Sequence, residues 1–209
     1  QHAGRYLLEN GLTWGNSGNL SARSRQNHYL ITASGTQLGN LADDDFLECP
    51  IHFTEWPSFS RKPSKEMPMH TAVYQTRPEI NAVLHASPFY STLAACSKLT
   101  LPADLFVENM YYLERVARVC YAHPGSDDLA TAVGKQAKHA NVLLLENHGV
   151  LVYDINVKEA LMGLHTLELV CRMVVEAKSA GIELAHLPAA TVQEVLHKAG
   201  YREPREWPA

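Results

Sequence analysis

"NVLLLENHGVLVYD", residues 141–154, contains two short apolar runs, Val142–Leu145 and Val150–Tyr153, separated by a four-residue turn. Apolar runs of this length on either side of a tight turn predict a β-hairpin with buried strands. The turn carries His148, which is followed by Gly149. Because a hairpin pairs its two strands antiparallel, this stretch argues against a purely parallel sheet.

Further strands and helices are expected on the N-terminal and C-terminal sides of this hairpin. Strands are predicted at about 18–23, 28–35, 46–51 and 80–85. Helices are predicted at 1–12, from about 67, from 87 to about 98, within 125–140, and at 156–181 and 191–199. This order mixes hairpins with helices, which favours an α/β fold with a largely antiparallel sheet covered by helices. No repeat or linker interrupts the chain, so residues 1–209 are expected to form a single domain.

Several of these helices carry recognisable end signals. The residues predicted to cap helix N-termini are Ser87, Ser126, Asn156 and Thr191. Pro88 suits the first position of its helix, where its missing N–H is not needed. Gly181 is expected to end the long helix that Asn156 begins.

Composition excludes several classes of function. The chain has 209 residues, 46% of them hydrophobic and 19% charged, with a net charge of −4, as in an ordinary soluble globular protein. No basic stripe indicates nucleic-acid binding, and the longest apolar runs are far below the roughly 20 residues that span a membrane. The four cysteines form no CxxC pair, which favours reduced thiols in a cytoplasmic protein over a disulfide scaffold.

Three residues stand where a rigid scaffold would present a side chain. Glu66 precedes a predicted helix, His85 ends a predicted strand, and His148 lies in the hairpin turn. Two imidazoles and one carboxylate can hold a divalent metal ion and leave coordination positions open, as in a catalytic site. The alternative is that each residue is hydrogen-bonded separately, and spacing along the sequence does not choose between the two.

Six motifs relate the chain to a known family. They are GNSGNLSAR, ITASGT, PSKEMPMHTAVY, INAVLHASP, HPGSDDLATAV and LLLENHGVLVYD. In their order and spacing the chain resembles the class II aldolase/adducin family over nearly its whole length. This family includes fuculose-phosphate and rhamnulose-phosphate aldolases, ribulose-phosphate 4-epimerase and related decarboxylases. The resemblance implies a three-layer α/β/α sandwich around a mostly antiparallel sheet, assembled as a homotetramer with active sites between subunits.

The resemblance also implies roles for individual residues. His85 and His148 match metal-binding histidines, and Glu66 matches the catalytic carboxylate, which ligates the metal until substrate displaces it. The ion implied is Zn²⁺, with Mn²⁺, Fe²⁺ or Co²⁺ as alternatives. The family's phosphate pocket falls on Gly18, Asn19, Ser34, Gly35, Ser64 and Lys65. Backbone N–H groups at glycine turns, hydroxyls and an ammonium are suited to binding an anion.

The expected function is that of a metal-dependent lyase, of aldolase or decarboxylase type. Its substrate would be a small sugar phosphate or a keto or hydroxy acid, cleaved through an enediolate, with Glu66 moving the proton. The alternative is a non-catalytic assembly module, like the adducin head, with a degenerate metal site. Retention of Glu66, His85 and His148 favours the enzyme, whereas Ser87 favours the assembly module.

The chain departs from the family pattern at the end of the strand at 80–85. The family has His-x-His, whereas here Ser87 follows His85 at that spacing, and Glu108 is a candidate for the missing ligand. Phe106 takes the place of a tyrosine that donates a proton in fuculose-phosphate aldolases. Two tyrosines, Tyr111 and Tyr112, lie nearby but out of register.

One further histidine lies close to Glu66 in the sequence. His70 follows Glu66 by one helical turn, and Tyr74 follows His70 by another. His70 could orient Glu66 or a metal ligand, or it could be a hydrogen-bonded core histidine without such a role.

Overall fold

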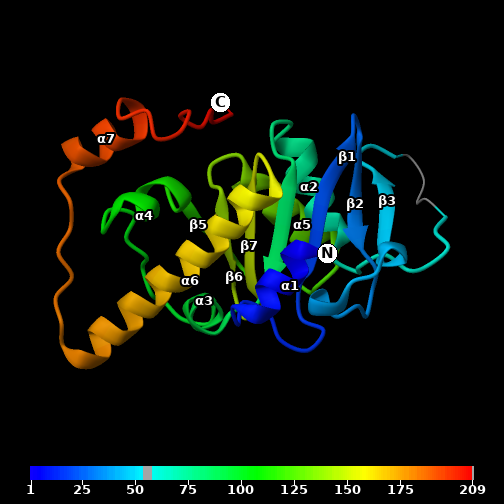
Figure 1. Cartoon of the computed structure of the whole chain (residues 1–209), viewed down its shortest axis with the longest axis horizontal. Helices are drawn as coiled ribbons and strands as arrows, with labels where there is room; N and C mark the ends of the chain where they lie inside the picture. Colours follow the sequence, from blue (N-terminus) through cyan, green and yellow to red (C-terminus); the bar gives the residue numbers. More distant parts are fainter. Residues whose placement is uncertain (54–57, 209) are drawn as a thin grey trace.

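The computed structural model of the protein describes residues 1–53 and 58–208 (Figure 1). The strands are β1 (Asn19–Arg25), β2 (His28–Thr32), β3 (Phe46–Pro50), β4 (Ala82–Ala86), β5 (Val116–Val119), β6 (Val142–Leu145) and β7 (Gly149–Asp154). The α-helices are α1 (His2–Glu9), α2 (Met67–Thr76), α3 (Phe89–Ala95), α4 (Val107–Tyr112), α5 (Asp127–Ala137), α6 (Val157–Ala180) and α7 (Ala189–His197). Within the described ranges, no helix combines the length and hydropathy needed to cross a bilayer.

The strands form one seven-stranded sheet in the order β3-β2-β1-β4-β7-β6-β5. All neighbouring strands are antiparallel except β5 and β6, which are parallel. The predicted hairpin is confirmed as β6–β7, but its turn is one residue shorter than expected because Gly149 pairs with Leu145. The mixed α/β class and the mostly antiparallel sheet are therefore confirmed.

Each face of the sheet contributes to its own apolar core. Alternate residues of β4 point in opposite directions, so Leu84 packs into one core and Val83 into the other. The first core includes apolar residues of α1, α3 and α6, and the second those of α2 and α5. Figure 1 shows α6 and α1 on one side of the sheet and α2 and α5 on the other.

Local end signals predicted some helix boundaries correctly. The side chain of Ser126 accepts a hydrogen bond from Leu129 N at 3.1 Å, and that of Asn156 accepts one from Glu159 N at 2.9 Å. Gly181 ends α6 in the left-handed conformation, as predicted. The N-cap predicted at Thr191 is wrong, because α7 begins earlier, after Pro188.

Other elements differ from the prediction in length or were not predicted. Helix α1 is shorter than the predicted helix at 1–12 and ends at Glu9. The six-residue α4 and the four-residue β5 lie in a stretch where no element was predicted. Both are too short to show a clear hydrophobic period in the sequence.

The predicted N-cap at Ser87 is wrong. Helix α3 begins at Phe89, and the Ser87 side chain makes no capping bond. The first N–H groups of α3 are bound instead by Glu168 of α6, which accepts hydrogen bonds from Tyr90 N at 2.9 Å and Ser91 N at 2.7 Å. A charged residue from a distant helix therefore satisfies the donors that a local hydroxyl was expected to satisfy.

The C-terminal segment is bound at one end of the sheet. Arg202 and Arg205 form ion pairs with Asp154, the last residue of β7. The indole of Trp207 lies between the guanidinium groups of Arg77 and Arg115, 4.8 Å and 4.2 Å from its ring centroid. Because β7 starts next to His148 and ends at Asp154, the segment lies at the end of the sheet opposite His148.

The capping of α3 by Glu168 gives a stability prediction. Glu168→Ala should lower the free energy of unfolding by about 1–2 kcal/mol, because the first N–H groups of α3 lose a charged acceptor. Ser87→Ala should change it by less than about 0.5 kcal/mol. Urea unfolding followed by circular dichroism measures both, and a larger cost for Ser87→Ala than for Glu168→Ala would contradict this account of the cap.

Candidate metal centre

Strand pairing brings three separate segments together at one end of the sheet. Strand β4 pairs with β1 so that His85 lies opposite Asn19, and with β7 so that His85 lies opposite Leu151. The His85 side chain therefore points to the face covered by α2. Glu66 is the residue before α2, and His148 is the residue before β7.

The side chains of Glu66, His85 and His148 form one cluster. Glu66 Oε2 lies 3.1 Å from His85 Nε2, and Glu66 Oε1 lies 2.8 Å from His148 Nε2. The two imidazole centroids are 4.7 Å apart. Glu66 and His85 are buried and His148 is partly buried. Their potential ligand atoms all lie within 4.8 Å of one another, which is close enough for all three to contact one ion.

The hydrogen bonds around the cluster fit a metal ion. His85 Nδ1 lies 3.0 Å from the carbonyl oxygen of Val150 and donates to it, so His85 Nε2 is the ring nitrogen that faces Glu66. A proton on Nε2 or a cation between Nε2 and the carboxylate would satisfy both atoms. Among the described residues, Glu66 Oε1 is also buried without a hydrogen-bond partner, because its close contact with His148 lacks hydrogen-bond alignment.

The charge state of Glu66 suits a metal ligand or a base. Burial alone would raise the pKa of Glu66, but close contacts with His148 and His85, and their charges, hold it well below its usual range. Glu66 Oε2 also accepts a hydrogen bond from Asn19 Nδ2 at 2.9 Å. The carboxylate is therefore ionised at neutral pH.

Two glycines allow the loops to approach the end of β4. A Cβ on Gly149 would lie 2.7 Å from Ala86 O and 2.8 Å from Ser87 Oγ, and one on Gly18 would lie 2.5 Å from His85 O. Both glycines have positive φ, of 155° and 84°, which also disfavours other residues. Larger residues at these positions would push His148 or Asn19 away from His85.

The cluster lies in a cleft of about 530 Å³ that also contains the predicted anion-binding residues. The predicted site residues that line it are Gly18, Asn19, Ser34, Gly35, Ser64, Lys65, Glu66, His85 and His148. Two backbone hydrogen bonds, Ser64 N to Thr32 O at 3.0 Å and Ser34 N to Lys62 O at 2.9 Å, bring the segment before α2 against the end of β2. Every residue predicted for the site thus faces one cavity.

Some residues of the cleft were not predicted. They are Trp14, Asn16, Ser17, Ala33, Thr36, Ser87 and Pro124. Asn16 and Ser17 lie within the motif GNSGNLSAR, residues 15–23, and Trp14 directly precedes it, so this motif was the available signal for all three. Trp14 is 64% exposed, and its indole N–H donates to Ser87 O at 3.2 Å.

Four residues considered near the site do not line the cleft. Glu108 is not part of the metal-type cluster, so its proposed role as the missing ligand is not supported. Phe106 packs against the core on the α6 side. The hydroxyl groups of Tyr111 and Tyr112 donate to Val195 O and Glu159 respectively.

Ser87 occupies the position of the expected third histidine. It lines the cleft together with His85 and His148, and its hydroxyl is not needed to cap α3. A neutral hydroxyl is a weak ligand for zinc compared with an imidazole. The protein therefore offers a metal ion two imidazoles and one carboxylate, with space beside them.

Comparison with known proteins agrees with this geometry. A sequence model of the Class II Aldolase and Adducin N-terminal domain matches residues 1–175. The chain is 32% identical to a 3-oxo-tetronate 4-phosphate decarboxylase of Haemophilus influenzae over 169 residues, which are 79% of this chain and 80% of that protein. It is 28% identical to an L-fuculose phosphate aldolase of the same organism over 188 residues, 90% and 86% of the two chains.

The fold is also similar to solved structures. YgbL from Klebsiella pneumoniae superposes with a TM-score of 0.82 at 30% sequence identity, and the match covers 93% of this chain and 94% of that one. The match therefore covers almost the whole of both chains.

Ser87→His should increase the affinity of the protein for zinc. An added imidazole would enter on the same side as His85, and because losing even an indirect support of a metal site costs about 10–100-fold, we expect a gain of at least about 10-fold. Titration of zinc in competition with a chelator measures the affinity. Asn16→His, at an exposed position of the same cleft, is the control and should bind zinc like the wild type.

Two results would contradict this account. Equal affinity of the wild type and Ser87→His would show that another group completes the metal site. Equal gains for Ser87→His and Asn16→His would show that any added histidine in the cleft recruits zinc.

Proposed function

The chain belongs to the class II aldolase and adducin family, and from this we propose that it is a metal-dependent lyase acting on a small sugar phosphate or a phosphorylated keto or hydroxy acid. One observation carries the proposal: the Glu66–His85–His148 cluster and the predicted anion-binding residues line the same cleft. A small substrate could bind both groups at once.

The proposed phosphate end of the cleft is built from backbone and side-chain donors. Glycine turns at Gly18 and Gly35 expose N–H groups, Ser34 and Ser64 offer hydroxyls, and Lys65 adds a positive charge. The names of both Haemophilus relatives specify phosphorylated substrates, fuculose phosphate and 3-oxo-tetronate 4-phosphate. These names support a phosphorylated substrate for this chain.

The proposed metal is a divalent ion, Zn²⁺ first, with Mn²⁺, Fe²⁺ or Co²⁺ as alternatives. His85 and His148 would hold it through Nε2, and Glu66 through a carboxylate oxygen. A bound ion supplies the positive charge that stabilises the enediolate left when a C–C bond breaks. Glu66 is ionised in its buried position, so in aldol cleavage it could accept the proton of the substrate hydroxyl whose carbon becomes the new carbonyl group, and then return that proton to the enediolate. In decarboxylation CO₂ leaves, and Glu66 would pass a proton from solvent to the same kind of enediolate, so these residues could serve either reaction.

We also propose that the protein is a cytoplasmic homotetramer whose subunits are single three-layer α/β/α sandwiches. Large apolar side chains are exposed at the cleft end of the sheet. Trp14 is 64% exposed, Phe89 70% and Tyr121 59%. Phe89 follows Ser87 closely, and Tyr121 follows β5, which runs parallel to the strand that leads to His148. A second copy that covers these residues would also border the cleft.

Glu66→Gln should lower kcat by about 10²–10⁴-fold, because an amide cannot accept the proton that a positioned carboxylate takes. The measurement is turnover of fuculose 1-phosphate and of 3-oxo-tetronate 4-phosphate by protein saturated with zinc, with bound zinc determined in parallel. Glu48→Gln, which changes a carboxylate paired with Arg25 outside the cleft, is the control and should keep wild-type turnover. An active Glu66→Gln variant would show that another group moves the proton.

Size-exclusion chromatography with light scattering should give about four times the chain mass of 23.2 kDa. Phe89→Glu should shift the mass toward smaller species, because a charge would be buried at the proposed interface. Ile182→Glu, at a residue 62% exposed beyond the far end of α6, is the control and should remain tetrameric. A wild-type monomer at micromolar concentration would contradict the proposed assembly.

A further inference from the structure

A row of buried polar side chains leads from the interior of the protein to Glu66. Tyr74 OH lies 2.8 Å from Ser21 Oγ, which lies 2.7 Å from His70 Nδ1. His70 Nε2 lies 2.6 Å from Asn19 Oδ1, and Asn19 Nδ2 lies 2.9 Å from Glu66 Oε2. All five side chains belong to buried residues, none more than 5% exposed. We call this row the Glu66 hydrogen-bond chain.

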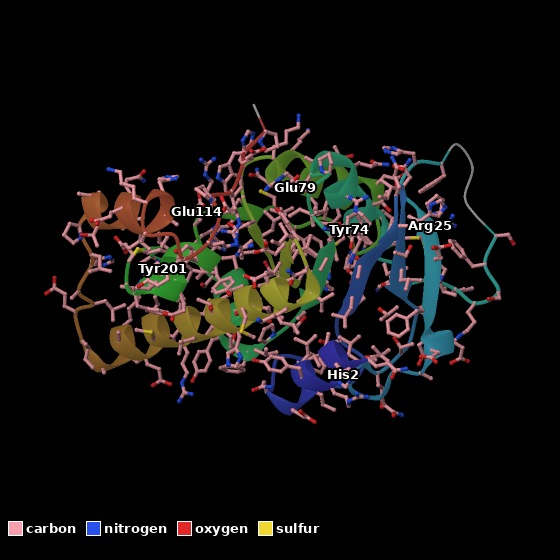
Figure 2. The ribbon with its side chains drawn as sticks, turned by 45° about the horizontal axis from the view of Figure 1, so that its top comes forward. His2, Arg25, Tyr74, Glu79, Glu114 and Tyr201 are labelled. Atoms are coloured by element: carbon pink, nitrogen blue, oxygen red, sulfur yellow. The ribbon has the colours of Figure 1, made fainter. Side chains whose placement is uncertain are left out.

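Two periodicities place these five residues in one row. His70 and Tyr74 follow Glu66 at intervals of one helical turn along α2. Asn19 and Ser21 are two apart on β1, so both face α2. Figure 2 shows Tyr74 inside the molecule, close to β1. The helix and the strand therefore contribute alternate members of the chain.

The orientation of the Asn19 amide sets the direction of the hydrogens in this row. Asn19 presents its NH₂ group to Glu66 Oε2 and its carbonyl oxygen, which can only accept, to His70 Nε2. His70 must then carry its proton on Nε2, and its Nδ1 must accept from the Ser21 hydroxyl. Because the Ser21 hydroxyl hydrogen points to His70, the Ser21 oxygen accepts a hydrogen bond from the Tyr74 hydroxyl. All four bonds point toward Glu66.

The state of His70 agrees with this direction. Burial, with a contribution from the charge of His85, lowers the pKa of His70 to about 3, so its imidazole is neutral at physiological pH. A neutral imidazole has one donor and one acceptor nitrogen, as the row requires. The opposite tautomer would place a lone pair against Asn19 Oδ1.

We propose that His70 is a positioning residue for Glu66, and that the Ser21 hydroxyl holds His70 in the tautomer with which it acts. His70 Nε2–H holds the Asn19 amide with its NH₂ group toward Glu66. If this amide rotated by 180°, its oxygen would face the carboxylate and repel it. The row thus keeps the carboxylate aimed at the metal position and at the substrate. The inference deepens the proposed function and rests on it.

A neighbouring hydrogen bond on the same helix provides a matched comparison. Thr71 Oγ1 lies 2.6 Å from Tyr29 OH and donates to Met67 O at 3.1 Å. This hydroxyl is buried like that of Ser21, but its partners do not lead to Glu66. Thr71→Val therefore removes a buried hydroxyl of α2 without touching the Glu66 hydrogen-bond chain.

The experiment compares Ser21→Ala, Ser21→Thr, Tyr74→Phe and Thr71→Val with the wild type, using two measurements that need no substrate. The first is ¹⁵N NMR of histidine-labelled, metal-free protein. We expect His70 to be the Nε2–H tautomer in the wild type, in Ser21→Thr and in Tyr74→Phe, in which Ser21 can still donate. In Ser21→Ala this preference should be lost, while Thr71→Val should keep it.

The second measurement is zinc affinity by competition with a chelator. Ser21→Ala should bind zinc about 10–100-fold more weakly, the usual cost of losing an indirect support of a metal ligand. Ser21→Thr, which keeps a hydroxyl, should restore affinity to near the wild-type value. Thr71→Val should leave affinity unchanged even though it loses a buried hydrogen bond of similar length.

The outcomes separate this proposal from the proposed function. An Nδ1–H tautomer of His70 in the wild type, or equal zinc affinities of Ser21→Ala and wild type, would overturn it. A similar loss of affinity in Thr71→Val would show that the row serves only general packing and would overturn it too. Wild-type protein that binds no zinc would overturn both the metal centre and this proposal. Protein that behaves as expected in both measurements but turns over neither substrate would overturn only the proposed reaction.

Discussion

The antiparallel register between β1 and β4 is the constraint on which the site depends. It sets Asn19 opposite His85 and Ser21 opposite Val83, so that these side chains face α2, while Leu20 and Leu84 face the other core. A slip of one residue would turn every side chain of β1 to the opposite face of the sheet. Asn19 would lose its hydrogen bond to Glu66, and Leu20 would leave its apolar core for the position beside Glu66 and His70. The burial of the leucines therefore enforces the geometry of the cluster.

The same arrangement makes the buried carboxylate of Glu66 tolerable. A buried, unpaired carboxylate would be strongly destabilising, and its usual response is to take up a proton. Here two imidazoles and an amide surround it, and Gly18 and Gly149 let the loops that carry these groups approach closely. Within the described part of the chain, Glu66 Oε1 nevertheless has no aligned hydrogen-bond donor. A cation bound between the carboxylate and the two imidazoles would interact with all three groups at once. Binding of such an ion would therefore also stabilise the folded state.

Features with a local cause could be predicted from the sequence. The β6–β7 hairpin, the N-caps at Ser126 and Asn156 and the stop at Gly181 each depend on residues a few positions apart. Features that depend on distant contacts could not. Ser87 has the composition of a cap, but Glu168 of α6 takes that role. The helical spacing of Glu66 and His70 predicted that these two residues lie on one face of α2. The partners of His70, Ser21 and Asn19, lie on β1, and their contact with His70 depends on the sheet register, which the sequence does not give. For the cleft, the family resemblance marked the predicted anion-binding residues, but not Trp14, whose only signal is its position directly before the motif GNSGNLSAR.

Because Glu168 of α6 caps α3, the residue after the end of β4 that lines the cleft, Ser87, is not needed to stabilise that helix. Had Ser87 capped α3, replacing it would have changed stability and the cleft together. Because Glu168 binds the first N–H groups of the helix, residue 87 faces the cleft without supporting the fold. Asn19, Glu66 and His85 have no such freedom, since each is tied into the buried hydrogen bonds and the sheet register. Within one fold, function varies at positions that the scaffold presents but does not need. Residue 87 is such a position, and a serine there occupies less of the cleft beside the two imidazoles than a histidine would.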